Sequence, residues 1–353
     1  MRHRSGERTV ALVIAAAILG AACSNGDSNT AQDAGRAGSP TAAASAASSP
    51  TPIQDQASPV QPAEALDELV VADKIGSLKG EGELASGLGD LWFSSIDKNA
   101  LIRIDPKTKK VLATVQFPRD TVPMKAAFGE GAVWVAGNGT YKVFRIDPHS
   151  MQITDRLQLE EQPAGIAVGG GSIWVSLNEY ATDQAANGVA RVDPVTMKVT
   201  KTIPLNGPTH IEFFDGHLYV VADNDDTVYR MNPQGETTDQ VHIVGDLWMT
   251  VGEGSLWVIG GLDAPIVEVD LETFEPVRSI TASIDGFFGI EAAEGALWIS
   301  SEYQVEQIEV ASGNGIAVAN IGLESEEALW DIEVAFGSVW VVDTFDGLLR
   351  IEP

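Results

Sequence analysis

The sequence predicts an all-β protein, a seven-bladed β-propeller of four-stranded blades, and two repeating patterns lead to this prediction. The first pattern is a glycine, any residue, an aliphatic residue and an aromatic residue, and it occurs seven times. Its aromatic residues are Trp92, Trp134, Trp174, Tyr219, Trp257, Trp298 and Trp340. They recur about every 40 residues, a period typical of propeller blades. The second pattern is an Arg-Ile-Asp-Pro signature at residues 103–106 and 145–148, with variants in the other repeats, such as Arg-Ile-Glu-Pro at residues 350–353.

The third repeat shows the expected blade most clearly. Its four short runs rich in β-branched residues each predict a strand, at residues 165–168, 173–176, 189–192 and 198–203. Gly169-Gly170-Gly171 supplies the first turn, because glycine tolerates positive φ. Asp193-Pro194 begins the last turn, with Asp and Pro at the two positions that a type I turn prefers for them.

The seventh repeat reaches the end of the chain at Pro353, directly after its third strand. Its fourth strand is therefore expected from the other end of the sequence. Residues 72–78 resemble residues 199–205 and precede the first strand of the first blade. We expect this N-terminal strand to pair with the last blade and close the ring, because an open ring would expose sheet edges.

The N-terminus predicts export. Residues 1–22 combine a basic start with an uncharged run from Val10 to Ala22, which is too short to span a bilayer and suits a signal peptide. The only cysteine, Cys23, follows Leu19-Gly20-Ala21-Ala22. This arrangement resembles a bacterial lipoprotein signal, although Gly20 stands where leucine is usual. The resemblance implies that Cys23 carries a lipid and anchors the chain to the outer side of the cell membrane.

Composition divides the rest of the chain into two parts. Residues 23–64 are rich in Ala, Ser, Thr and Pro and contain no Trp, Phe or Tyr, so we expect a disordered tether. Residues 65–353 hold the repeats and form the predicted propeller. The formal net charge of −28 excludes nucleic acid as a partner. It is explained either by solubility or by a preference for cationic ligands or divalent metal ions.

The repeats as a whole resemble those of a known group of seven-bladed propellers. The form Gly-x-Leu-Trp-Val, then Arg-Ile-Asp-Pro-x-Thr, is similar to YVTN-type and NHL-type repeats and to the streptogramin (virginiamycin B) lyases, over about residues 69–353. Neither the Gly-His nor the Trp-Asp pair of WD40 blades recurs. The group includes binding modules and a few metal-dependent enzymes, so the resemblance implies a fold and leaves the function open.

First strands line the central channel of a propeller, and alternate residues face it. Counting back nine residues from each aromatic residue gives Glu83, Lys125, Gly165, His210, Trp248, Gly289 and Asp331. Counting back seven gives Ala85, Ala127, Ala167, Glu212, Thr250, Glu291 and Glu333. These positions are more polar than a protein core, so we expect them to face the channel. Carboxylates held together raise one another's pKa or collect a divalent cation.

The resemblance to the lyases implies a chemistry for this channel. Those enzymes open a cyclic ester by elimination, with a histidine base and a divalent metal held by glutamates. His210 would be the base, and Glu212, Glu291 and Glu333 would hold Mg²⁺ or Ca²⁺. The alternative is a water-filled channel with solvated acids.

A second candidate region is the loop face between second and third strands and before first strands. Aromatic and acidic residues gather there in the sequence: Tyr141, Tyr180, Phe287, Phe288, Tyr303, Trp330 and Phe345, with Asp183, Asp223, Asp225, Asp226, Asp246, Asp263, Asp285, Glu302, Glu326 and Glu327. Such a face suits a cationic peptide, an amine or a sugar. We therefore predict ligand binding by Trp248, Phe288 and Trp330, together with Lys125 and Asp331. Alternatively, Phe288 and Trp330 merely plug the channel mouth.

Three functions remain open on these grounds. We expect a monomeric, membrane-anchored binding or scaffolding module for an envelope protein, a peptide or a small ligand. The alternative is a metal-dependent lyase or hydrolase, and a third hypothesis is a structural spacer. The sequence contains no P-loop, no Cys-His metal cluster and no nucleophile elbow, which would have indicated other enzyme classes.

Overall fold

The computed structural model describes residues 67–178, 187–245, 247–261, 264–284, 286–301, 303–321 and 329–353. All of them belong to one compact unit, residues 54–353. The predicted signal peptide, Cys23 with its predicted lipid and the predicted tether lie outside the described residues. Within the described residues, no helix has the length and apolarity needed to span a membrane.

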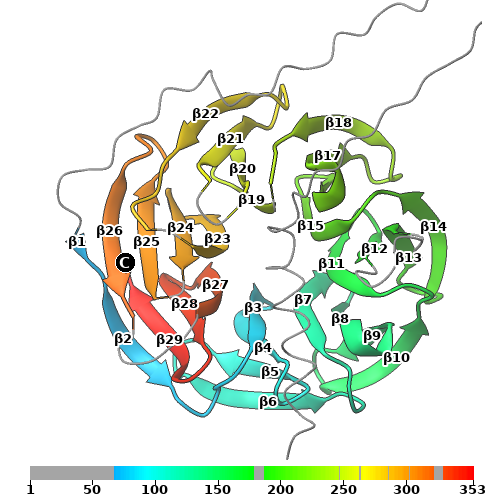
Figure 1. Ribbon diagram of the computed structural model, residues 1–353. Coiled ribbons are helices and arrows are strands. Elements are labelled where there is room, and N and C mark those ends of the chain that lie inside the picture. Colours follow the sequence, from blue (N-terminus) through cyan, green and yellow to red (C-terminus); the bar gives the residue numbers. More distant parts are fainter. Residues whose placement is uncertain are drawn as a thin grey trace, which may run out of the picture. The chain divides into compact units, whose positions relative to one another are not determined.

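The described residues form seven sheets arranged in a ring, which confirms the predicted propeller (Figure 1). Blade one consists of β3 (Gly82–Gly87), β4 (Asp90–Ser95), β5 (Ala100–Asp105) and β6 (Lys110–Gln116). Blade two consists of β7 (Pro123–Gly129), β8 (Ala132–Gly137), β9 (Lys142–Asp147) and β10 (Gln152–Gln158). Blade three consists of β11 (Pro163–Gly169), β12 (Ser172–Leu177), β13 (Gly188–Asp193) and β14 (Lys198–Pro204). The third blade matches its predicted strands to within two residues.

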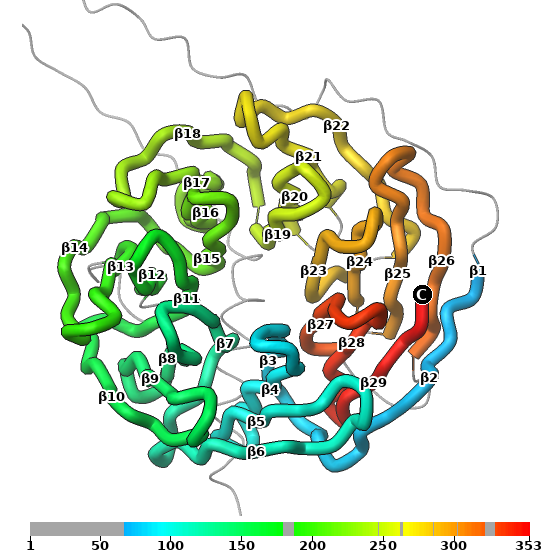
Figure 2. The backbone as a smooth tube through the Cα atoms, turned by 180° about the vertical axis from the view of Figure 1, so that it is seen from behind, coloured from blue at the N-terminus to red at the C-terminus, as the bar shows by residue number. Residues whose placement is uncertain are grey.

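Blades four to six repeat this plan. Blade four consists of β15 (Pro208–Phe214), β16 (His217–Ala222), β17 (Thr227–Met231) and β18 (Thr237–His242). Blade five consists of β19 (Trp248–Gly252), β20 (Ser255–Ile259), β21 (Ile266–Asp270) and β22 (Pro276–Ile280). Blade six consists of β23 (Phe287–Ala293), β24 (Ala296–Ser301), β25 (Gln304–Glu309) and β26 (Gly315–Asn320). In each blade the first strand lies nearest the axis and the fourth lies outermost, in both views (Figure 2).

The last blade closes the ring with a strand from the N-terminal side. It contains β27 (Leu329–Ala335), β28 (Ser338–Asp343), β29 (Gly347–Glu352) and, outermost, β2 (Val70–Ile75), which pairs antiparallel with β29. The predicted closure is confirmed, and the strand begins and ends two to three residues earlier than predicted. The short β1 (Asp67–Glu68), which the sequence did not predict, adds a parallel fifth strand to β26 of blade six.

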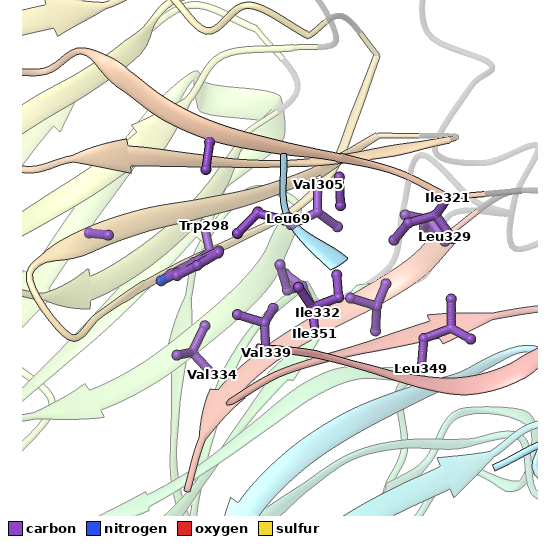
Figure 3. Close-up of a cluster of buried hydrophobic side chains, with 14 residues drawn as sticks. Leu69, Trp298, Val305, Ile321, Leu329, Ile332, Val334, Val339, Leu349 and Ile351 are labelled. Atoms are coloured by element: carbon purple, nitrogen blue, oxygen red, sulfur yellow. The ribbon is translucent and has the colours of Figure 1, made fainter. Parts of the chain in front are cut away.

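Hydrophobic cores fill the interfaces between neighbouring blades. Figure 3 shows the core between blades six and seven, where Trp298, Ile332 and Val339 meet. Leu69, which separates β1 from β2, packs into the same core. The N-terminal segment therefore contributes both a strand and a buried side chain to the closure.

The Arg-Ile-Asp-Pro signature holds neighbouring blades together. Arg103 lies over the ring of Trp92, 5.3 Å from its centroid, and donates a 3.0 Å hydrogen bond to the carbonyl of Pro148 in the next blade. Blade five has Glu268 in place of the arginine, and Arg278 of the adjacent strand pairs with it at 2.5 Å and lies over Trp257. An arginine thus covers this tryptophan even though the signature of blade five is changed.

Candidate functional site

Ionisable side chains of the first strands gather around the propeller axis, as the alternation predicted. We call them the axial cluster: Glu83, Lys125, His210, Glu212, Glu291, Asp331 and Glu333. Their neighbours in sequence, such as Leu84 and Ile332, are buried between blades. The Lys125 side chain keeps 45% of its surface exposed, so the space that the cluster encloses is open to solvent.

β-Bulges aim part of this cluster. The pairing of β7 with β8 shifts between Pro123 and Ala126, and that of β15 with β16 shifts between Pro208 and Ile211. The same irregularity occurs in β27 between Leu329 and Asp331. An extra residue in one strand re-aims the side chains beside it. Lys125, His210 and Asp331 therefore all lie at or beside a bulge.

One side of the cluster, contributed by blades seven, one and two, is largely neutralised. The ammonium of Lys125 lies 3.3 Å from Glu333, which also accepts a 2.8 Å hydrogen bond from the backbone N–H of Ser86. Asp331 accepts a 2.7 Å bond from the N–H of Leu84, and Glu83 accepts the N–H of Lys125. We call Glu83, Lys125, Asp331 and Glu333 the neutralised side.

The opposite side, contributed by blades four to six, has few internal partners. Glu212 accepts one long hydrogen bond of 3.3 Å from the N–H of Val251. Within the described residues, the carboxylate of Glu291 forms no hydrogen bond, and the buried Nδ1 of His210 has no partner. The ring of Trp248 lies 6.1 Å from that of His210 and is partly exposed. We call His210, Glu212, Trp248 and Glu291 the open side.

Burial and mutual repulsion control the protonation of the acids. Burial raises the pKa of Glu83 to about 7, and the nearby carboxylate of Asp331 adds to this effect. Burial likewise raises the pKa of Glu212 to about 7 and that of Asp331 to about 6. Burial and then repulsion from Glu333 hold the pKa of Glu291 well above its ordinary value. Near neutral pH the cluster therefore carries protons that solvated carboxyls would have lost.

The two basic groups respond in opposite directions. Burial lowers the pKa of Lys125, but attraction to Glu333, Asp331, Glu291 and Glu83 outweighs it, so the pKa stays well above its ordinary value. Burial lowers the pKa of His210 to about 4, and the charge of Lys125 adds to this effect. At neutral pH the lysine is thus a permanent cation and a poor nucleophile, and the imidazole is neutral.

The residues at the axis do not fit the divalent metal that the lyase resemblance implies. No three His, Cys, Asp or Glu side chains of the described ranges are placed to ligate one ion. Glu333, one of the predicted ligands, is already paired with the lysine. Lys125 supplies the positive charge around which the carboxylates gather, so the lysine occupies the electrostatic role that a bound metal would have.

The predicted ligand-binding residues fall into two groups. Lys125, Asp331 and Trp248 belong to the axial site, which we define as the axial cluster together with Trp248. Trp330 is the residue before Asp331 and packs against the core between blades seven and one. Phe288 is half-buried at the bulge of β23. Trp330 and Trp248 thus pack against different blade interfaces, and a common binding site for Trp248, Phe288 and Trp330 stays a prediction.

The loop face is described only in part. Tyr180, Asp183, Asp246, Asp263, Asp285, Glu302, Glu326 and Glu327 lie outside the described residues. Phe287 is buried in the core between blades five and six, and Phe345 is 52% exposed. One axial residue, Glu83, received no predicted role, although the alternation had already placed it at the axis. Glu83 and Lys125 carry opposite charges at equivalent positions of neighbouring blades, and this pairing could have indicated a role for Glu83 from the sequence.

Comparisons with known proteins support the fold. No known family profile and no curated protein matches the sequence significantly. A catalytically inactive virginiamycin B lyase from Staphylococcus aureus, solved with quinupristin, is 17% identical, with a TM-score of 0.66 over 81% of this chain and 99% of that one. A streptogramin B lyase structure is also 17% identical, with a TM-score of 0.65 over 81% and 96%.

A third similar structure belongs to an enzyme with a different function. Kuenenia stuttgartiensis hydrazine synthase is 13% identical, with a TM-score of 0.64 over 79% of this chain and 97% of that one. At such identities the comparisons show the fold and leave the chemistry to the site. The chain is a seven-bladed β-propeller with the architecture seen in the streptogramin B lyases.

Proposed function

We propose that this chain is a membrane-anchored binding protein that holds a small ligand at the axial site. The observation that carries the proposal is the open side, where Glu212, Glu291 and His210 present polar atoms with few or no internal partners beside the partly exposed indole of Trp248. Buried polar groups are normally paired, and the buried Nδ1 of His210, left without a partner, costs free energy. A ligand that supplies the missing partners would offset this cost and gain contact with Trp248.

The membrane anchor in this proposal rests on residues 1–23 alone. We expect wild-type protein, expressed in a bacterial host, to partition with membranes and to incorporate a fatty-acid label. Cys23→Ser removes the only thiol and should abolish labelling and release the chain. A labelled Cys23→Ser protein, or an unlabelled wild type, would contradict the anchor and leave the axial site unaffected.

The lyase is the second candidate, and the fold comparison favours it. A neutral His210 is in the protonation state that a general base requires, although a pKa of about 4 makes it a weak one. Lys125 among the acids argues against a catalytic divalent metal. The structure therefore supports binding better than turnover.

Quinupristin, the ligand of the similar lyase structure, tests the two candidates against each other. We expect no product when the full-length protein is incubated with quinupristin and Mg²⁺, because the described residues at the axis form no preformed metal centre. Ring opening by elimination leaves the mass unchanged, so the reaction is followed by chromatography. A linear product that His210→Ala no longer forms would replace binding by catalysis as the function.

A further inference from the structure

The axial site divides its charges unevenly, and this division indicates what it takes up. On the neutralised side, Lys125 and backbone N–H groups satisfy Glu83, Asp331 and Glu333. On the open side, Glu212 and Glu291 form no ion pair among the described residues, and Lys125 attracts them only from the neutralised side. The site as a whole holds five carboxyl groups and one lysine, so it favours a further positive charge over a negative one.

A divalent metal ion is a poor match for the unpaired carboxylates of the open side. A divalent ion needs several ligands converging at about 2–2.6 Å, and no such group of three exists within the described ranges. The open side instead combines hydrogen-bond acceptors with a partly exposed indole. An ammonium group donates N–H bonds to carboxylates, and an indole face attracts a cation and contacts an apolar chain.

We infer that the axial site binds an organic ammonium compound, with its N–H groups on Glu212 and Glu291 and its apolar part against Trp248. This inference rests on the proposed binding function and specifies the ligand class for it. His210 remains neutral beside the ligand and offers Nδ1 as a further hydrogen-bonding atom. Lys125 stays on the neutralised side and limits the number of cations that the site can accept.

Binding should depend on pH in a defined direction. Glu212 and Glu291 must be ionised to attract the ammonium, and both have raised pKa values in the free protein. Glu83 and Asp331 ionise in the same range, Glu333 is paired with Lys125 on the neutralised side, and His210 gains no charge above pH 6. Affinity should therefore rise between pH 5 and pH 8, with release of protons on binding.

Calorimetric titration of the full-length protein with 2-phenylethylammonium tests this inference. The controls are 2-phenylethanol, which has the same shape without the charge, 3-phenylpropanoate, which carries the opposite charge, and Mg²⁺. We expect the ammonium compound to bind at least about tenfold more tightly than any control at pH 8. Equal affinity for 2-phenylethanol, or no binding of the ammonium compound up to about 10 mM, would overturn the inference.

Two variants locate the binding. Glu291→Gln preserves the shape of the side chain and should weaken the binding of 2-phenylethylammonium by about tenfold or more, because it removes a hydrogen bond between opposite charges. Glu275→Gln removes an equal charge from an exposed turn and should leave the affinity unchanged. Near-ultraviolet circular dichroism checks that both variants are folded. Equal affinities of the two variants would contradict the assignment.

The outcomes separate the inference from the proposed function. If 3-phenylpropanoate binds and Trp248→Leu abolishes that binding, the axial site is a ligand site and the ammonium inference is wrong. If the ammonium compound and every other compound tested leave the protein unbound, both the inference and the proposed function fail.

Discussion

Deletion of residues 70–75 is expected to prevent the propeller from forming a stable closed ring. β2 supplies the fourth strand of blade seven and covers β29, whose Leu348, Leu349 and Ile351 are buried. Each lost ladder hydrogen bond contributes about 1 kcal/mol, and a typical domain is stable by only about 5–15 kcal/mol. Without β2, the edge of β29 is also open to pairing with other chains.

Asp73 shows that β2 completes blade seven and also links it to blade one. Its carboxylate lies 2.5 Å from Lys109 of blade one and 3.2 Å from Arg350 of blade seven. These ion pairs join the first and the last blade through the N-terminal strand. The deletion therefore removes contacts on both sides of the closure (Figure 1).

The effect of the deletion on stability is measured by thermal unfolding, and its effect on aggregation by size-exclusion chromatography. We expect the deletion variant to lose the cooperative transition of the wild type or to aggregate. A deletion of equal length at residues 30–35, within the predicted tether, is the matched control and should leave the melting temperature unchanged. A deletion of residues 70–75 that melts like the wild type as a monomer would show that the ring is stable without its N-terminal strand.

Lys125→Met is expected to produce the second large effect, a loss of stability that depends on pH. The lysine neutralises part of a carboxylate cluster, and removing one partner of a buried ion pair costs about 3–5 kcal/mol. Because the Lys125 side chain is 45% exposed, we expect a smaller loss of about 1–3 kcal/mol at pH 8. Chemical denaturation at pH 8 and at pH 5 measures it.

The sign of the pH dependence follows from the pKa shifts. Glu83 and Glu212 have pKa values raised from 4.5 to about 7, so between these values the folded state binds more protons than the unfolded state. Their contribution to stability is present at low pH and is lost as the pH rises through about 7. His210, lowered from 6.5 to about 4, acts in the opposite direction, being stabilising above 6.5 and losing this contribution as the pH falls.

This pH dependence distinguishes charge neutralisation from packing as the role of Lys125. At pH 5 the raised carboxyls are largely protonated in the fold, so they need Lys125 less and the variant should approach the wild type. Lys110→Met, on an exposed outer strand, is the matched control and should change little at either pH. The same loss from Lys125→Met at both pH values would show that its role is packing and not charge neutralisation.

The sequence predicted those features that depend on repetition along the chain. The seven aromatic residues, the four strands of each blade and the closing strand all follow from a period near 40 residues and from alternation within strands. The axial cluster followed from counting positions back from Trp92 and its six equivalents. The physical reason is that these patterns report local backbone geometry and burial, which each blade repeats.

Features that depend on a break in the pattern were not predictable. The bulge in β27 inserts Trp330 before Asp331, so a residue expected on the loop face packs into a blade interface. In blade five, Glu268 stands where other blades have the signature arginine, and Arg278 of the next strand takes that role. Only the pairing of β21 with β22 shows that Arg278 lies beside Glu268. Likewise, the neutralised and open sides arise from contacts between blades that are far apart in sequence.

A crystal structure of the full-length protein with 2-phenylethylammonium at pH 8 tests the central claim most directly. The account predicts the ammonium nitrogen about 3 Å from the carboxylates of Glu212 and Glu291, with the phenyl ring against Trp248. It also predicts that Lys125 keeps its contact with Glu333. A ligand seated on the loop face, or an axial site that holds a metal ion on its carboxylates in preference to the amine, would contradict it.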